Sequence, residues 1–169
     1  EDRRVAAMRE VARPGVHRAW IVAAVTLGAL VTAAAFRSSI GLLIEPLEQE
    51  FGWSESDYGN IVMAFSAAYA IGLLLFGKIV DKIGTKNGYT VSVVFWSIAA
   101  MLHAAVKSTF GFGLVRAFLG VSEAGNFPTA IKATAEWFPK KERALATGIF
   151  NSGTNIGAVI APVIVPWIL

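Results

Sequence analysis

Five apolar stretches follow one another along the chain, and short polar segments separate them. They cover residues 19–47, 59–80, 89–106, 110–131 and 144–169. A transmembrane helix needs about 20 mainly apolar residues, with a range of roughly 17–25. The first stretch contains Arg37 and closes at Glu45 and Pro46, and the last is still apolar at Leu169. The pattern predicts an all-α membrane protein with five transmembrane helices.

Three charged residues lie inside these stretches, namely Arg37, Arg116 and Glu123. A lone charge at the centre of a membrane helix costs roughly 2.5–3.5 kcal/mol, so three unpaired charges would cost on the order of 8–10 kcal/mol. We expect such side chains to face a water-filled cavity, a partner or a solute. The pattern therefore indicates a transport protein.

Composition excludes several other classes of function. The chain is 55% apolar and has a mean hydropathy of +0.58, which is typical of membrane proteins. It contains no cysteine, and His17 and His103 are too far apart to suggest a metal site. Two arginines and one glutamate supply no nucleophile, so we expect neither an enzyme nor a cofactor. A structural or channel-forming subunit stays an alternative if the protein has five helices in all.

Basic residues collect on one side of the predicted membrane. The segments on that side contain Arg3, Arg4, Arg9, Arg13, Arg18, Lys78, Lys82, Lys86, Lys132, Lys140, Lys141 and Arg143, whereas the segments on the other side contain Lys107. Cytoplasmic loops carry the excess of Lys and Arg. Residues 1–18 are therefore predicted to be a cytoplasmic tail. This distribution explains the net charge of +3 by topology and lipid contact rather than by nucleic-acid binding.

The segment after the second stretch reads Gly77-Lys-Ile-Val-Asp81-Lys-Ile-Gly84-Thr-Lys86. It resembles the G-x-x-x-D-R-x-G-R-K loop signature of the major facilitator superfamily, with Lys82 and Thr85 in place of basic residues of that signature. We expect Gly77 to let another helix approach, Asp81 to accept hydrogen bonds from basic groups, and Gly84 to form a tight turn.

Two further segments narrow the resemblance. They are Leu114-Val-Arg116-Ala-Phe-Leu-Gly120-Val-Ser-Glu123-Ala-Gly-Asn126-Phe-Pro128 and residues 136–157, which begin Glu136-Trp-Phe-Pro. From about residue 51 to 169 the chain is similar to the anion:cation symporter family, and most to its hexuronate transporters. The resemblance implies an inverted-repeat helical bundle, alternating access and proton-driven uptake of an organic anion in a bacterial cytoplasmic membrane. It also implies that residues 19–169 are a fragment of the N-terminal bundle, without the sixth helix and the C-terminal bundle.

The first stretch departs from this pattern. Symporters of this kind often carry N-Y-x-D-R there, whereas this chain has Phe36 before Arg37. The residues that follow resemble monocarboxylate or oxalate/formate-type carriers of the same superfamily. The alternatives are a divergent member or a fusion near Phe51, and exchange of a monocarboxylate or oxalate is the alternative function.

Arg116 and Glu123 are seven residues apart, so we expect them on one face of the fourth helix, which Asn126 extends. We expect this face to line the central cavity, where Arg116 and Asn126 contact the substrate. Burial favours the protonated form of Glu123 and a nearby arginine favours the ionised form, which makes Glu123 the candidate proton carrier. The alternative is a permanently ionised Arg116–Glu123 pair.

The resemblance implies that Arg37 binds the anion, through the two parallel hydrogen bonds that a guanidinium can donate. It also implies that Tyr69 contacts the substrate. Asn151 and Asn155 are candidate partners of sugar hydroxyls. For Tyr69, Asn151 and Asn155, hydrogen bonding between helices is the alternative.

A cytoplasmic gate is the last expected site. Asp81, Glu136 and Arg143 all fall on the cytoplasmic side, where a charge network could hold the outward-facing state closed. The loop residues Gly77, Gly84 and Lys86 are expected to belong to the same gate.

Overall fold

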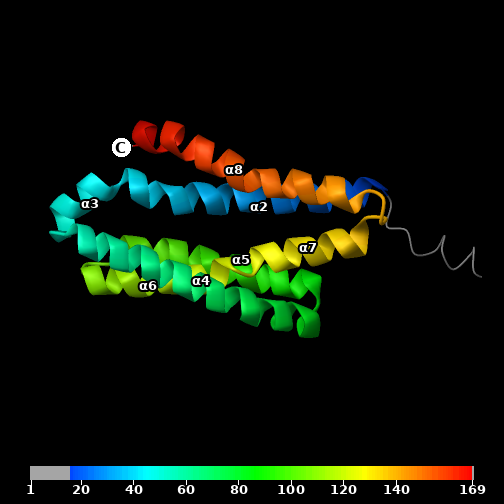
Figure 1. Ribbon diagram of the computed structural model, residues 1–169, viewed down its shortest axis with the longest axis horizontal. Helices are drawn as coiled ribbons and strands as arrows, with labels where there is room; N and C mark the ends of the chain where they lie inside the picture. The colour runs from blue at the N-terminus through cyan, green and yellow to red at the C-terminus, as the bar shows by residue number, and fades with distance from the viewer. Residues whose placement is uncertain (1–15, 169) are drawn as a thin grey trace, which may run out of the picture.

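The structure is a computed structural model that describes residues 16–168, and it consists of long helices lying side by side (Figure 1). The predicted arginines of the tail at positions 3, 4, 9 and 13 lie outside the described residues. The helices are α2 (Val16–Leu42), α3 (Ile44–Phe51), α4 (Glu55–Ile83), α5 (Thr85–Leu102), the 3-10 turn η1 (His103–Ala105), α6 (Thr109–Glu123), α7 (Asn126–Trp137) and α8 (Arg143–Ile168).

Four helices are long and apolar enough to cross a membrane. They begin at Arg18, Glu55, Thr85 and Arg143 and end at Leu42, Ile83, Ala105 and Ile168. The all-α prediction is therefore confirmed, and four of the five expected spans are matched by a single helix each.

The fourth expected span is not one continuous helix. Its residues divide between α6 and α7, which a turn at Ala124 and Gly125 separates. Pro128 has no N–H to donate to the carbonyl four residues earlier, that of Ala124. The predicted single helix over residues 110–131 is thus wrong, because α6 stops at Glu123 and α7 continues to Trp137.

The first expected span is also shorter than predicted. Helix α2 ends at Leu42, and residues 44–51 form the separate helix α3. Pro46 cannot donate a backbone hydrogen bond to α2, which explains the end of the helix. Gly52 follows α3 with a φ of 66°, and Ser54 begins α4 with a capping box to Asp57.

Two tight helix pairs build the bundle. Helix α8 packs along α2, and α4 packs along α6, with α5 against α6. Glycines permit both approaches. A Cβ at Gly157 would lie 2.7 Å from the Cβ of Ala34 on α2, and one at Gly72 would lie 2.7 Å from the Cβ of Ala124. Small residues let helix backbones approach closely in lipid.

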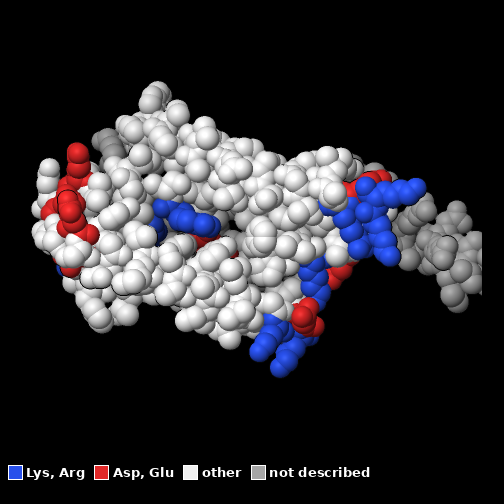
Figure 2. Space-filling model, viewed as in Figure 1, with Lys and Arg blue, Asp and Glu red and all other residues white. Residues whose placement is uncertain are grey.

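The two ends of the bundle carry opposite charge (Figure 2). Acidic side chains gather at the end formed by α3 and the start of α4, and basic side chains gather at the other end. Between the ends the surface is almost uncharged on this face, apart from one basic group in a hollow. This separation matches the distribution of Lys and Arg in the sequence.

Candidate functional site

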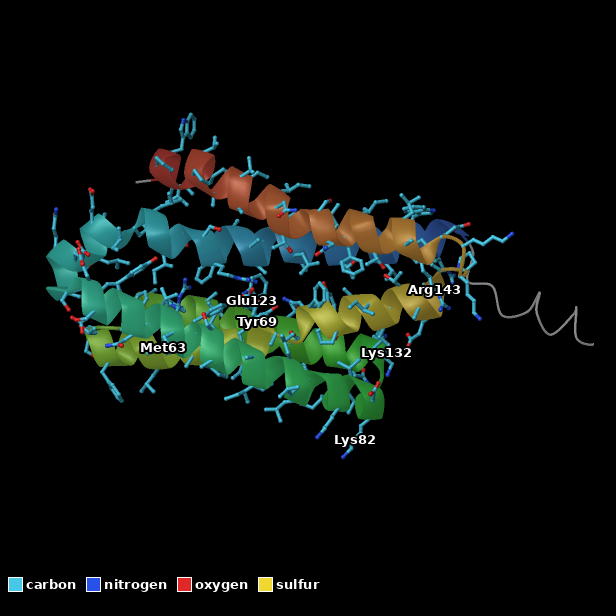
Figure 3. The ribbon with its side chains drawn as sticks, viewed as in Figure 1. Met63, Tyr69, Lys82, Glu123, Lys132 and Arg143 are labelled. Carbon is cyan, nitrogen blue, oxygen red and sulfur yellow. The ribbon has the colours of Figure 1, made fainter. Side chains whose placement is uncertain are left out.

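The charges expected inside the spans meet midway along the bundle. A terminal nitrogen of Arg37, Nη2 on α2, donates to Oε1 of Glu123, the last residue of α6. Glu123 is 1% exposed, whereas the side chain of Arg37 is 37% exposed. Figure 3 places Glu123 beside Tyr69 near the middle of the helices. The buried carboxylate is therefore paired with a guanidinium that is partly exposed.

Arg116 does not pair with Glu123. Its Nη2 donates to the backbone carbonyl of Arg37 at 3.2 Å, and its guanidinium lies 5.5 Å from the ring centre of Phe65. It is 3% exposed. The alternative of a permanent Arg116–Glu123 pair is thus not the arrangement that forms. Two guanidinium groups thus lie near one carboxylate that pairs with Arg37 alone, and with Glu123 ionised the three groups carry one excess positive charge.

A cavity of about 380 Å³ opens beside this cluster. Its wall contains Arg37, Ser38, Ile40, Gly41, Tyr58, Val62, Phe65, Ser66, Tyr69 and Arg116. The basic group that Figure 2 shows in a hollow, with acidic atoms beneath it, occupies the same middle region of the bundle. Sites for small molecules usually measure roughly 300–1,000 Å³ and are mainly apolar with a few polar groups. The cavity has the size and the chemistry to hold a small anion.

Aromatic rings flank the cation at this cavity. The guanidinium carbon of Arg37 lies 5.2 Å from the ring centre of Tyr69 and 5.6 Å from that of Phe65. Such contacts orient a guanidinium without neutralising it. Nε of Arg37 and Oε2 of Glu123 are buried and have no hydrogen-bond partner among the described residues. These atoms leave hydrogen-bonding capacity for a solute or a proton.

The structure separates the three asparagines from this cavity. Asn126 is 1% exposed and contacts Ser92 on α5, and Asn151 and Asn155 are exposed on α8. None of the three is among the residues of the cavity wall. The common face expected for Asn126 and Arg116 is therefore not found, because the turn after Glu123 redirects the chain.

The expected gate residues do not form one network among the described residues. Asp81 pairs with Lys132 of α7 at 2.8 Å, while Oε1 of Glu136 accepts from Thr85 at 2.6 Å. Arg143 donates to backbone carbonyls of residues 135 and 138. Lys132 and Arg143 lie toward the same end of the bundle in Figure 3. Helix α7 is thus joined to the α4–α5 connection through Lys132 and Glu136.

Gly84, in the α4–α5 connection, and Gly77, inside α4, have different surroundings. Gly84 has a φ of 82°, which favours glycine, and turns the chain from α4 into α5, and Lys86 lies in the first turn of α5. A Cβ at Gly77 would meet no atom within 4 Å. The close helix approach expected at Gly77 is instead found at Gly72.

Sequence reasoning missed several residues at these sites. Phe65 and Tyr58 resemble ordinary residues of a membrane helix, and only the packing brings them into the wall of the cavity that contains Arg37. Lys132 carried a detectable signal, because it is a lysine just beyond an apolar stretch, but that signal indicates topology rather than a partner.

Known proteins share this chain's sequence and fold. The sequence profile described as Major Facilitator Superfamily matches residues 25–169. The chain is 38% identical over 150 residues to the hexuronate transporter of Escherichia coli (strain K12), covering 89% of this chain and 34% of that protein. It is 35% identical over 150 residues to the galacturonate transporter of Dickeya chrysanthemi, covering 89% of this chain and 43% of that protein.

A solved structure matches as well. It is that of a bacterial homologue of the human lysosomal transporter Spinster, in an inward-facing and unoccupied conformation. The TM-score is 0.81 at 25% identity, and the match covers 88% of this chain and 31% of that chain. The chain thus spans about a third of the length of the hexuronate transporter and of this solved structure. Together with the profile match, these similarities show that the chain belongs to the Major Facilitator Superfamily and has hexuronate and galacturonate transporters among its relatives.

Proposed function

We propose that the chain forms the N-terminal bundle of a proton-coupled symporter that takes up a hexuronate or a related sugar acid by alternating access. In this proposal residues 1–18 are a cytoplasmic tail, and residues 19–169 supply the first five transmembrane helices, with α6 and α7 together forming the fourth. A sixth helix and a second bundle complete the transporter, because half of such a protein has nothing to alternate against. Its place is the bacterial cytoplasmic membrane, with the basic end of the bundle inside.

The observation that carries this proposal is the arrangement of Arg37 and Arg116 in the wall of one cavity, with the buried Glu123 paired to Arg37. With Glu123 ionised, the three groups have one excess positive charge, and Arg37 is occupied by Glu123. A proton on Glu123 releases Arg37, whose forked donors then bind the carboxylate of the solute. Proton and anion therefore enter the site together.

Other residues fit a sugar acid rather than a plain carboxylate. Tyr69 lines the cavity, where it can contact the hydroxyl groups of a sugar. Asn151 and Asn155 are exposed on α8, where they are open to the second bundle. Asn126 is assigned here to the packing of the fourth span, because Ser92 and the turn enclose it.

The basic end is proposed to act as the cytoplasmic gate. Its contacts are Asp81 with Lys132, Glu136 with Thr85, and Arg143 with α7. In our proposal these contacts hold α7 to the α4–α5 connection while the cytoplasmic side is closed.

Exchange of a monocarboxylate or of oxalate is the second candidate function. Phe36 occupies the position where related symporters often carry an aspartate, and its ring lies 6.0 Å from the guanidinium carbon of Arg116. Among the described residues the site therefore holds one buried carboxylate, Glu123, which limits the protons that this half can carry.

The test is glucuronate uptake into proteoliposomes by the complete transporter that contains this chain. An inward proton gradient should drive accumulation by the wild type. Glu123→Gln should abolish accumulation against a concentration gradient and retain exchange of labelled for unlabelled glucuronate, because glutamine cannot carry the proton. Asp57→Asn at the acidic end serves as the control and should accumulate glucuronate as the wild type does.

Two outcomes would contradict the proposal. Accumulation by Glu123→Gln equal to that of the wild type would remove Glu123 as the proton carrier. Exchange without any proton-driven accumulation in the wild type would favour the second candidate function. A thermal-shift screen with glucuronate, galacturonate, gluconate, lactate and oxalate would then identify the anion.

A further inference from the structure

The turn between α6 and α7 lies directly beside the charge cluster. Glu123 is the last residue of α6, and α7 resumes at Asn126. The last four carbonyls of a helix have no hydrogen-bond donor within the helix, so another group must supply one. In a membrane no bulk water is present to replace that donor, and neighbouring Ser or Thr side chains commonly do so. The carbonyl of Ser122 is one of these groups, one residue before Glu123.

Ser92 of α5 supplies the donor. Its Oγ donates to the carbonyl of Ser122 at 2.6 Å and lies 3.2 Å from Oδ1 of Asn126, so one hydroxyl contacts both sides of the turn. Ser92 is 0% exposed, and Ser122 and Asn126 are 2% and 1% exposed. A buried acceptor that loses its only donor is costly, because no solvent replaces it.

The surroundings of the turn are built for this close approach. A Cβ at Gly125 would lie 2.7 Å from Oγ of Ser92 and 2.5 Å from Cδ1 of Phe76. Only glycine lets α5 come near enough for the Ser92 hydroxyl to reach the turn. The contact therefore depends on how closely α5 packs against the α6–α7 turn, and not only on the conformation of the Ser92 side chain.

We propose that Ser92 is a positioning residue for coupling: its hydroxyl holds the α6–α7 turn so that Glu123 stays directed at Arg37. The inference rests on the proposed function, in which Glu123 and the anion compete for Arg37. The titratable groups that face Glu123 are Arg37 from α2, Tyr69 from α4 and Arg116 from α6, with His103 of η1 beyond Arg116. Ser92 and Asn126, at the turn itself, are uncharged.

This role predicts an unusual sign for Ser92→Ala. Loss of the hydroxyl loosens the turn and weakens the contact of Glu123 with Arg37, so Arg37 is more available to the anion. The ionised Glu123 competes with the anion for Arg37 most strongly at alkaline pH. At that pH, glucuronate should bind to Ser92→Ala about tenfold more tightly than to the wild type. A substitution that merely damaged the site would weaken binding instead.

The control is Ser122→Ala. The hydroxyl of Ser122 is equally buried, but it donates only to the carbonyls of Phe118 and Leu119 within α6. Its removal leaves the Ser122 carbonyl and the Ser92 contact in place. Glucuronate affinity should therefore change less than twofold.

A double-mutant cycle tests whether Ser92 acts through Glu123. The complete transporter is prepared as wild type, Ser92→Ala, Glu123→Gln and the double variant, and glucuronate affinity is measured by calorimetry. Glu123→Gln already removes the competing charge, so Ser92→Ala should have no further effect in that background. Weaker binding by Ser92→Ala, or effects that add in the double variant, would overturn the inference.

A measurement without any anion separates this inference from the proposed function. Hydrogen–deuterium exchange of the peptide over residues 119–130 should be faster in Ser92→Ala than in the wild type and in Ser122→Ala. Equal exchange in all three proteins would show that Ser92 does not hold the turn. Absence of glucuronate binding by the wild type would instead refute the proposed substrate, while the exchange data still decide on the contact.

Discussion

At the scale of single residues, the buried charges of the cluster formed by Arg37, Arg116 and Glu123 differ in their partners. Glu123 is buried and has a charged partner, whereas Arg116 is buried with only a backbone carbonyl and aromatic rings around it. A buried guanidinium without a carboxylate is costly in a membrane. In the proposed function, an anion in the cavity supplies the missing negative charge.

Arg37→Lys tests the importance of the forked geometry. Lysine keeps the charge but cannot donate two parallel hydrogen bonds to one carboxylate. A hydrogen bond to a charged group contributes roughly 1.5–3 kcal/mol, so glucuronate affinity of the complete transporter should fall about tenfold or more. Calorimetry measures the change, and Arg18→Lys, at an exposed position near the start of α2, should leave affinity unaltered. Equal affinities for Arg37→Lys and the wild type would argue against direct anion binding by Arg37.

At the scale of helices, glycine positions decide which pairs approach closely. Helix α8 contains glycines that lie against another helix and a glycine that does not. A Cβ at Gly153 would lie 2.9 Å from the carbonyl oxygen of Leu27 on α2, whereas a Cβ at Gly148 would meet nothing within 4 Å. Gly153 thus lies on the face of α8 that packs against α2, whereas Gly148 lies on an exposed face.

Gly157→Ala should destabilise the protein, because the new methyl group meets the Cβ of Ala34 and backbone atoms of α2. Overpacking of this kind costs about 1–3 kcal/mol. The melting temperature in detergent should therefore fall by several degrees, measured by the loss of the monodisperse peak after heating. Gly148→Ala is the matched control on the same helix and should melt at or above the wild-type temperature, since alanine favours helix. Similar melting of both variants would contradict the close α2–α8 contact.

At the scale of the whole molecule, charge divides the bundle into an acidic end, a basic end and an apolar middle (Figure 2). The basic end also joins α7 to the α4–α5 connection, through Lys132 with Asp81 and with the carbonyl of Val80. These side chains are 30% and 75% exposed. The contact is consequently weak, and in the proposed function it breaks when the cytoplasmic side opens.

Asp81→Asn should shift the balance between outward-facing and inward-facing states toward inward-facing. Exposed ion pairs contribute roughly 0.2–1 kcal/mol, so the ratio of the two states should change by up to about fivefold. Distances between spin labels on the two bundles of the complete transporter measure this ratio. Lys82→Ala, one residue further along, controls for loss of a charge. An unchanged distance distribution in Asp81→Asn would remove Asp81 from the gate.

The sequence predicted much of the fold, and its errors have local physical causes. Hydropathy located every long apolar segment, since the length of a span follows from bilayer thickness. The division of the fourth span was missed, although Pro128 is visible in the sequence, because a proline in a membrane helix is often tolerated. The short helix α3 was missed for a similar reason: Pro46 was interpreted as the end of a span, not as part of a second helix.

The partner of Glu123 could not be predicted from spacing. Arg116 is seven residues away on the same helix, a rise of about 10 Å, and its guanidinium donates instead to the backbone carbonyl of Arg37. Arg37 is distant in the sequence but lies across the bundle on α2. Likewise, the positions of Asn126 and Ser92 depend on how α5 approaches the turn.

The sequence by itself determined which segments are apolar enough to span a bilayer, where charge enters them, which side collects the basic residues, and the family. These properties follow from local composition and from motifs that each lie within one segment. Only the tertiary structure decided that Arg37 rather than Arg116 meets Glu123, that Ser92 closes the α6–α7 turn, and that Lys132 meets Asp81. Such pairings depend on the relative rotation and depth of packed helices, which the order of residues along one helix does not specify.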